Sequence, residues 1–191
     1  MEPTSRVGET LREVLDPPTP DPPMPSGAPA AVLIPIVASP EASLLFTVRS
    51  DDLRRHSGEI SFPGGARHDE DADLLATALR ETEEELGIAP GSFDVVGRMG
   101  PQLSHVSGYA VVPFVGLLAE LPELRPNPME VAEVLEVRLA TLLEVERLVA
   151  RTWQGATYDT YEYATGGHTV WGLTGRILHE LLETIRREGW T

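Results

Sequence analysis

The helix expected over residues 72–86 constrains the fold of this chain more than any other segment. Leu75, Leu79, Thr82 and Leu86 recur at spacings of four, three and four, which places them on one side of a helix. Gly87 suits the C-terminal stop of such a helix. A helix with one apolar side needs a surface to cover, and we expect it to anchor on a sheet.

The same helix carries a cluster of glutamates. Residues three and four apart are neighbours on a helix, so Glu81, Glu84 and Glu85 project to one side, and Glu83 points elsewhere. Like charges at these offsets repel each other unless a cation lies among them. Oxygen ligands without a nearby His or Cys favour Mg²⁺ or Mn²⁺ over zinc. Taken alone, however, the cluster fits a solvated acidic face even better.

The segment just upstream favours the metal site. Phe62-Pro63-Gly64-Gly65 predicts a break between a strand and a loop, where the backbone can approach a ligand or an ion closely. Four acidic residues follow and also suit the start of a helix, namely Asp69, Glu70, Asp71 and Asp73.

Charge and missing residue types narrow the function further. The chain has 30 acidic and 15 basic residues, a formal charge of −15, and no cysteine or lysine. These absences exclude disulfides, thiol nucleophiles, thiolate metal sites and Schiff-base chemistry. The acidic balance argues against nucleic acid and anionic membranes as partners. Without a visible targeting segment, we expect a cytoplasmic protein with a small-molecule substrate.

Two regions are expected along the chain. Residues 1–29 form a lead-in, with a short helix over residues 5–15 and a proline-rich connector over 16–29, and residues 30–191 form the globular domain. We interpret the connector as a spacer that holds the first helix against the body, and a PxxP-type ligand is the alternative. Whether the lead-in packs on its own body or across the partner of a homodimer stays open.

Strands and helices are interspersed in the globular part without strict alternation, which predicts an α/β fold with a mixed sheet and helices on its faces. Strands are expected at residues 31–38, 44–49, 59–62, 93–99, 110–118 and 131–139, with a hairpin of 158–164 and 168–171 around Gly166-Gly167. Besides residues 72–86, helices are expected at 139–150 and 174–187.

The segment Gly65–Ile88 resembles the Nudix box, a Gly, five residues, Glu, seven residues, then Arg-Glu-apolar-x-Glu-Glu-x-Gly-apolar. The second half matches at Arg80, Glu81, Glu84, Glu85, Gly87 and Ile88, with Thr82 where an apolar residue is usual. In the first half Asp71 stands at the acidic position, and eight residues rather than seven separate it from Arg80. That insertion is typical of the coenzyme A pyrophosphatase branch of the family.

A second motif of that branch is similar to the segment directly upstream. It covers Leu45–Ser50, Leu53, His56, Gly58 and Phe62–Gly65. Shorter matches follow at Gly108–Gly116, Asn127–Val131 and Val170–Thr174, so the resemblance extends from about residue 30 to the last helix.

The resemblance implies an α/β/α sandwich and a hydrolase that cleaves a pyrophosphate with Mg²⁺ or Mn²⁺. By position, Glu81, Glu84 and Glu85 would hold the metal, together with the carbonyl of Gly64. The general base would be one of these glutamates or Glu130, and we carry Glu81, Glu84 and Glu130 as catalytic candidates. Arg80 would hold the glutamates by ion pairs.

Substrate recognition must come from other residues. Coenzyme A carries a 3′-phosphate, and arginine suits phosphate recognition. Arg49 and Arg67, with His56, are therefore the substrate-binding candidates, and Arg54 and Arg55 are weaker ones. We interpret His105, His168 and His179 as structural, because none has ligand-like spacing.

The leading hypothesis is hydrolysis of coenzyme A or a derivative to 3′,5′-ADP and 4′-phosphopantetheine. The alternative enzyme is a Nudix pyrophosphatase for ADP-ribose or another nucleoside diphosphate derivative. A catalytically silent, nucleotide-binding Nudix module is a third reading, but such modules usually lose a box carboxylate, and all three are present here.

Overall fold

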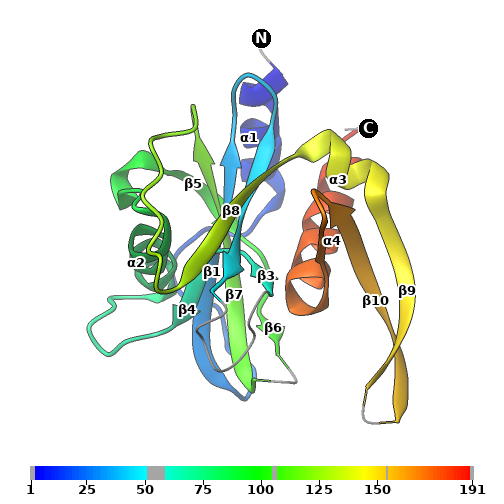
Figure 1. The fold of residues 1–191 in the computed structure, drawn as a ribbon. Coiled ribbons are helices and arrows are strands. Elements are labelled where there is room, and N and C mark those ends of the chain that lie inside the picture. Colours follow the sequence, from blue (N-terminus) through cyan, green and yellow to red (C-terminus); the bar gives the residue numbers. More distant parts are fainter. Residues whose placement is uncertain (1–2, 51–58, 105–106, 154, 190–191) are drawn as a thin grey trace.

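A mixed eight-stranded sheet forms the centre of the molecule (Figure 1). The computed structural model describes residues 3–50, 59–104, 107–153 and 155–189. The main strand order is β3-β2-β1-β7-β5, with β4 on β1, β6 on β7 and β8 on β2. The strands are β1 (Ala28–Val37), β2 (Ser43–Arg49), β3 (Ile60–Ser61), β4 (Gly64–Ala66), β5 (Asp94–Arg98), β6 (Gln102–Leu103), β7 (Tyr109–Leu118) and β8 (Val131–Arg138).

Strand β1 organises the sheet. It pairs in parallel with β7 over its whole length, from Ala28 opposite Tyr109 to Val37 opposite Leu118. On its other side, the end of β1 pairs with β2 and its beginning pairs with β4, both antiparallel. The sheet is therefore mixed, as the sequence predicts.

Helices cover both faces of the sheet. Because side chains alternate along a strand, Leu33 of β1 packs under helix α2 (Leu74–Leu86), while Ile34 packs toward α1 (Pro3–Val14) and α4 (Gly172–Arg187). Figure 1 shows α2 on one side of the sheet and α4 on the other. The expected α/β/α sandwich is confirmed. No helix in these described ranges is long and apolar enough to cross a membrane.

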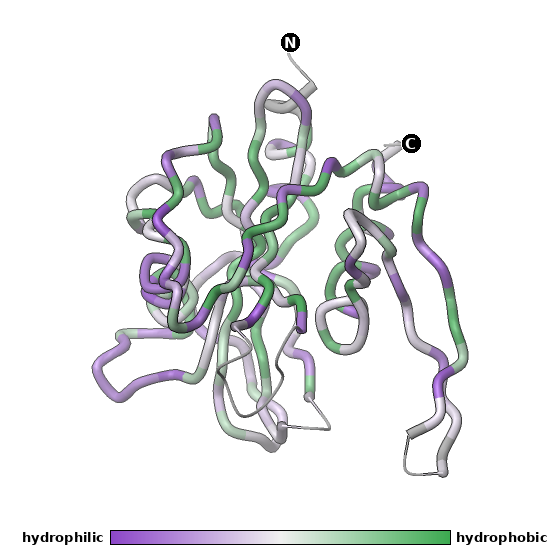
Figure 2. The backbone as a smooth tube through the Cα atoms, viewed as in Figure 1, coloured by the Kyte–Doolittle hydropathy of each residue, from purple (hydrophilic) through white to green (hydrophobic). Residues whose placement is uncertain are grey.

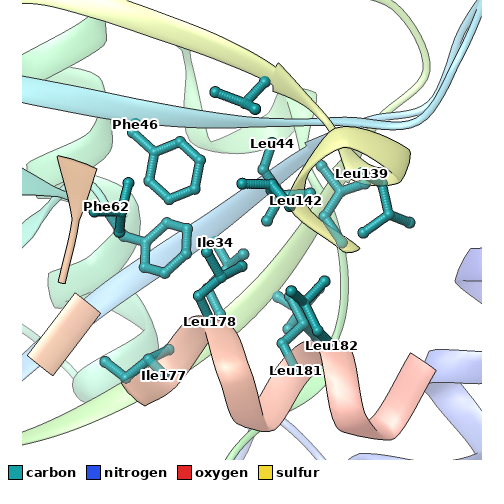
Figure 3. Packing of buried hydrophobic residues seen from close by; sticks show 14 of the residues in the cluster. Ile34, Leu44, Phe46, Phe62, Leu139, Leu142, Ile177, Leu178, Leu181 and Leu182 are labelled. Atoms are coloured by element: carbon teal, nitrogen blue, oxygen red, sulfur yellow. The ribbon is translucent and has the colours of Figure 1, made fainter. Parts of the chain in front are cut away.

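The larger core lies between the sheet and α4 (Figure 3). The rings of Phe46 and Phe62 stack with their centroids 4.8 Å apart, beside Ile34. Leu178 and Leu182 of α4 reach the same cluster and are fully buried. Because Phe62 directly follows β3, this packing fixes both β3 and the short connection from β3 to β4.

A second, three-stranded sheet lies beyond α4, and one helix prediction fails there. Helix α3 spans Leu139–Val145, and the chain then enters β9 (Glu146–Trp153) instead of continuing as a helix to residue 150. Strand β9 pairs with β10 (Ala156–Thr165), which pairs with β11 (His168–Val170). The expected hairpin is confirmed, since Gly166 and Gly167 form its turn with φ of 58° and 83°.

Two further details differ from expectation. Gly64 and Gly65 do not only break a strand, because they belong to β4 and pair with β1. The buried side of α2 also differs from the expected stripe in the first half of the helix, whereas Thr82 and Leu86 are buried as expected. Leu74 and Ala78 are fully buried and Leu75 and Leu79 only partly, because the sheet contacts the side centred on Leu74.

The lead-in folds back on its own chain. Val7 and Leu11 of α1 are buried in the same cluster as α4. In the connector, Asp16 forms an ion pair with Arg98 of β5 at 3.0 Å. These contacts fit the interpretation of the connector as a spacer that holds the first helix in place.

Candidate active site

Two glycines let β4 approach its neighbours unusually closely. A Cβ atom on Gly64 would lie 2.3 Å from the carbonyl oxygen of Ala31, and Gly64 has a φ of 156°. A Cβ on Gly65 would lie 2.6 Å from the carboxylate carbon of Glu81. At Gly64 the neighbouring atoms include the backbone of β1, so only glycine allows this close approach. At Gly65 a Cβ would meet the flexible end of the Glu81 side chain and would displace it from its position.

Arg80 and Asp71 form the centre of the polar network between β4 and α2. Arg80 donates from Nε and Nη2 to the two carboxylate oxygens of Asp71, at 2.9 and 3.0 Å. Asp71 also accepts from the backbone amide of His68 and the hydroxyl of Thr77. These bonds hold the pKa of Asp71 well below its usual range, because Arg80 above all stabilises the charged carboxylate.

The hydrophilic loop between β4 and α2, purple in Figure 2, is therefore fixed to the helix by Asp71. Asp73 caps the first turn of α2 by accepting from the amide of Ala76 at 2.8 Å. Asp21 of the connector accepts from the amide of Leu74 at 3.0 Å. Sequence reasoning missed Asp21, since nothing in the proline-rich segment indicates this contact.

Arg80 also connects the glutamates of α2. Its Nη1 donates to Glu81 at 2.9 Å and to Glu84 at 3.2 Å. The side chain of Glu84 is 50% exposed, and Glu83 is exposed on the solvent side of the helix. The predicted ion pairs of Arg80 are present, and Glu83 lies apart from them.

Glu85 is the most unusual group of the site. It is only 4% exposed, and its Oε2 has no hydrogen-bond partner among the described residues. Burial raises its pKa to about 8, and the charges of Glu81 and Glu130 act in the same direction. Arg49 and the backbone of Gly64 oppose the rise. Burial also raises the pKa of Glu81, against the effect of Arg80.

The loop before β8 closes the site from the other side. The amides of Arg125 and Asn127 donate to the carbonyls of Leu86 and Glu85, at 2.9 and 3.0 Å. Asn127 donates from its side chain to Glu130 at 3.3 Å. In the sequence, Asn127 stands out only as part of the Asn127–Val131 motif. In the structure, its hydrogen bond orients Glu130 toward the glutamates of α2.

The substrate-binding candidates lie in different surroundings. Arg49, at the end of β2, is partly buried and close enough to Glu85 to stabilise its charge. Arg67 donates to Asp21 at 3.3 Å and to the carbonyls of Asp71 and Ala72. The guanidinium of Arg67 thus holds the connector to the start of α2. His56, Arg54, Arg55 and His105 lie outside the described residues.

A second cluster of acids and a histidine lies far along the chain from this network. Oxygen or nitrogen atoms of Glu146, His179 and Glu183 lie within 4.8 Å of one another. Arg186 donates to both carboxylates at 2.9 Å, and Glu146 also accepts from Tyr163. These bonds account for the cluster without a cation. His179 bonds Glu146 and His168 contacts Glu133, which fits their structural interpretation.

The residues at the β4–α2 junction suit a hard divalent cation. A buried carboxylate is costly unless its charge is compensated, and the orphaned Oε2 of Glu85 faces this cost beside two further carboxylates. The available donors are oxygens, which Mg²⁺ and Mn²⁺ prefer. The single positive charge of Arg80 is shared by Asp71, Glu81 and Glu84, so it leaves most of the negative charge beside Glu85 uncompensated.

Comparison with known proteins agrees with this arrangement. The Nudix domain model matches residues 27–161. A protein of Photorhabdus laumondii, named an uncharacterized Nudix hydrolase, NudL, is 41% identical over 161 residues, covering 82% of this chain and 84% of its own. A NudL of Pectobacterium atrosepticum is 41% identical over 160 residues, covering 80% of each chain.

Solved structures share the fold. The Nudix domain of Shewanella oneidensis NrtR in complex with ADP ribose superimposes with a TM-score of 0.56 at 15% identity, covering 86% of this chain and 89% of that one. A MutT protein from Methanosarcina mazei gives a TM-score of 0.56 at 16% identity, covering 85% and 96%. The family match, the relatives and the geometry of the glutamates agree, and the chain belongs to the Nudix family as a pyrophosphohydrolase.

Proposed function

We propose that this Nudix enzyme hydrolyses the pyrophosphate bond of coenzyme A or a derivative, giving 3′,5′-ADP and 4′-phosphopantetheine. The observation that carries hydrolysis at this site is Glu85, a buried carboxylate with an unpartnered oxygen beside Glu81 and Glu130. The choice of coenzyme A rests on the motif from Leu45 to Gly65, which resembles that branch and which contributes Arg49 and Gly64 to the site.

The glutamates have distinct proposed roles. Glu81, Glu84 and Glu85, with the carbonyl of Gly64, would hold Mg²⁺ or Mn²⁺. When bound, such a cation neutralises phosphate charge and lowers the pKa of the attacking water. Arg80 positions Glu81 and Glu84 through its hydrogen bonds.

Proton removal from the attacking water needs one further carboxylate. The candidates for this general base are Glu130, Glu81 and Glu84. Glu130 accepts from the side chain of Asn127, so its orientation is fixed from outside the helix. A base must lie within hydrogen-bond reach of the water, and an anchored carboxylate satisfies this requirement better than a solvated one.

Arg49 is the stronger of the two arginine candidates for binding substrate phosphate. It is partly buried and faces the site, whereas Arg67 donates to three acceptors in the connector and the α2 loop. If Arg49 binds the 3′-phosphate, the kcat/KM of dephospho-coenzyme A should be roughly 10- to 150-fold lower than that of coenzyme A. The Arg49→Ala variant should then show the same kcat/KM for coenzyme A and dephospho-coenzyme A. Equal kcat/KM values in the unmodified enzyme would contradict this role of Arg49.

A substrate screen tests the proposal as a whole. Coenzyme A, ADP-ribose, NADH and dinucleoside polyphosphates are each incubated with enzyme and Mg²⁺ or Mn²⁺, and the products are identified by mass. We expect 3′,5′-ADP from coenzyme A at the highest kcat/KM of the set. A higher value for ADP-ribose would replace this proposal with the alternative pyrophosphatase.

A further inference from the structure

One side chain of the proline-rich connector contacts both ends of the loop between β4 and α2, residues 67–73. The carboxylate of Asp21 accepts from the amide of Leu74 at 3.0 Å and from the guanidinium of Arg67 at 3.3 Å. Leu74 is the first residue of α2, and Arg67 directly follows β4. Asp21 precedes the domain shared with the family. A residue from outside that domain therefore holds the segment that leads into the glutamate helix.

The connector is itself fixed to the body. Asp16, at its beginning, is bonded to β5 through both its backbone and its side chain. Pro22 restricts the backbone of Asp21 and is buried. Met24 packs against the core on the α2 side of the sheet. Asp21 thus lies on a segment that is anchored before and after it.

The loop that Asp21 contacts has little packing of its own. Among residues 67–73 only Asp71 is buried, and the loop is hydrophilic throughout (Figure 2). A loop of this kind depends on hydrogen bonds for its position. Arg67 supplies two of them, because it donates to the carbonyls of Asp71 and Ala72 at 3.2 and 3.3 Å. The bond of Asp21 to Arg67 therefore acts on the whole loop.

Asp71 connects the loop to the glutamates. Its carboxylate accepts from two nitrogens of Arg80, at 2.9 and 3.0 Å. The third nitrogen of Arg80 donates to two proposed metal ligands, Glu81 and Glu84. Because Arg67 bonds the backbone of Asp71, an unbroken series of polar contacts runs from the connector to the glutamates.

The amide of Leu74 provides a second connection. The first amides of a helix have no partner within the helix, and negative charge is favourable beside them. Asp73 caps Ala76 from within the loop, whereas Asp21 bonds Leu74 from the connector. Asp21 thereby fixes the first turn of α2, about two turns before the first of the glutamates.

We infer that Asp21 is a positioning residue of the active site, through which the proline-rich connector sets the arrangement in which the glutamates of α2 bind a divalent cation. The inference rests on the proposed metal site and deepens it. Asp21 acts through the loop and Arg80 and is not itself a ligand. It raises the fraction of the protein in which the glutamates are correctly placed, and the apparent metal affinity is proportional to that fraction.

The test is a titration with Mn²⁺ in the absence of substrate, in which free Mn²⁺ is measured by electron paramagnetic resonance. Asp21→Ala should raise the Kd of Mn²⁺ roughly 3- to 10-fold, less than the roughly 10- to 100-fold typical of residues that bond a metal ligand directly. Asp21→Asn should fall between the wild type and Asp21→Ala. Its amide oxygen can still accept from Leu74, but its bond to Arg67 loses the assistance of charge.

Asp16→Ala is the matched control, because it removes the same charge and an ion pair from the same connector. The Asp16 side chain is 63% exposed and is paired with Arg98 of β5. Exposed pairs contribute little, so the Kd of Mn²⁺ should change less than about twofold. Urea unfolding of the same samples shows that each variant is folded at the temperature of the titration.

Kinetics separate positioning from a purely structural role. At saturating Mn²⁺ the correct arrangement is populated without Asp21, so kcat of Asp21→Ala should return to within about twofold of the wild type. The half-saturating Mn²⁺ concentration should rise as the Kd does. A purely structural role would lower kcat at every Mn²⁺ concentration and leave the half-saturating concentration unchanged. If no coenzyme A derivative is hydrolysed, the proposed substrate fails, and the titration without substrate still decides the role of Asp21.

Amide hydrogen exchange of the metal-free protein tests the contact itself. Residues 67–76 should exchange faster in Asp21→Ala than in the wild type or Asp16→Ala, while β1 and β7 stay unchanged. The inference is overturned by an unchanged Kd of Mn²⁺ in Asp21→Ala, by an equal rise in Asp16→Ala, by unchanged exchange, or by a loss of kcat that saturating Mn²⁺ does not restore. A wild type that binds no Mn²⁺ overturns the inference together with the metal site.

Discussion

The four glutamates of α2 differ in their surroundings, although they lie within five residues. Glu81→Gln and Glu85→Gln should each reduce kcat by a factor on the order of 10³, because each removes a proposed metal ligand. Glu83→Gln should change kcat less than twofold, since Glu83 is exposed on the solvent side of the helix. Steady-state kinetics at saturating Mg²⁺ provide the measurement. Equal losses in all three variants would show that the helix presents a different side to the substrate.

The raised pKa of Glu85 predicts how stability depends on pH. Its value of about 8 lies above the ordinary value of 4.5, so the metal-free folded protein keeps this proton that the unfolded chain releases. The stabilisation is complete below about pH 4.5 and is lost as pH rises toward 8. Urea unfolding of metal-free protein should therefore show stability falling across this range, relative to Glu85→Gln, by on the order of a few kcal/mol.

Metal binding should depend on pH in the opposite direction to the stability of the metal-free protein. A cation requires the deprotonated carboxylate, so its affinity should increase as pH rises toward 8, and protons should be released on binding. Calorimetric titration in two buffers with different ionisation enthalpies measures that release. A wild type and a Glu85→Gln variant with parallel pH profiles would contradict the role of this proton.

At the scale of elements, α1 belongs to the core although it precedes the family domain. Leu11 is fully buried against the α4 side of the sheet, whereas Val14 is 43% exposed on the same helix. Leu11→Ala should destabilise the protein by about 2–5 kcal/mol and Val14→Ala by less than about 0.5 kcal/mol. Chemical denaturation with a constant m-value is the measurement. A small effect at Leu11 would mean that α1 detaches before the rest of the domain unfolds.

Elements determined by local pattern were predictable, and those determined by distant partners were not. Helix α2 follows from its apolar spacing and Gly87, and the β10–β11 hairpin follows from Gly166-Gly167. Glu146–Ala150 has a helical pattern but becomes strand, because β10 supplies a pairing partner that the local sequence does not indicate.

Some features of the candidate site follow from the local sequence, and others depend on distant segments. The box motif predicts which glutamates come together on α2. The burial of Glu85 depends on the loop that brings Asn127 and Glu130 to the end of α2, and no local pattern indicates that closure. The contact of Asp21 with the start of α2 is non-local as well.

At the scale of the whole molecule, an acidic protein must act on an anionic substrate. Its formal charge of −15 makes a bound cation the expected means of attracting phosphate. Chelation should abolish hydrolysis, Mg²⁺ or Mn²⁺ should restore it, and Ca²⁺ should restore little because it accepts looser coordination geometry. Product formation and circular dichroism are followed together, to separate loss of chemistry from loss of fold. Full activity in excess chelator would exclude a metal-dependent mechanism.

The contact between α1 and α4 joins the first helix of the chain to the last. During synthesis, α1 leaves the ribosome long before α4 exists, and its apolar side has no permanent partner in that interval. Val7 and Leu11 are then open to chaperones and to other nascent chains. The order in which the ribosome delivers the helices thus makes the completion of this domain a late event in its synthesis.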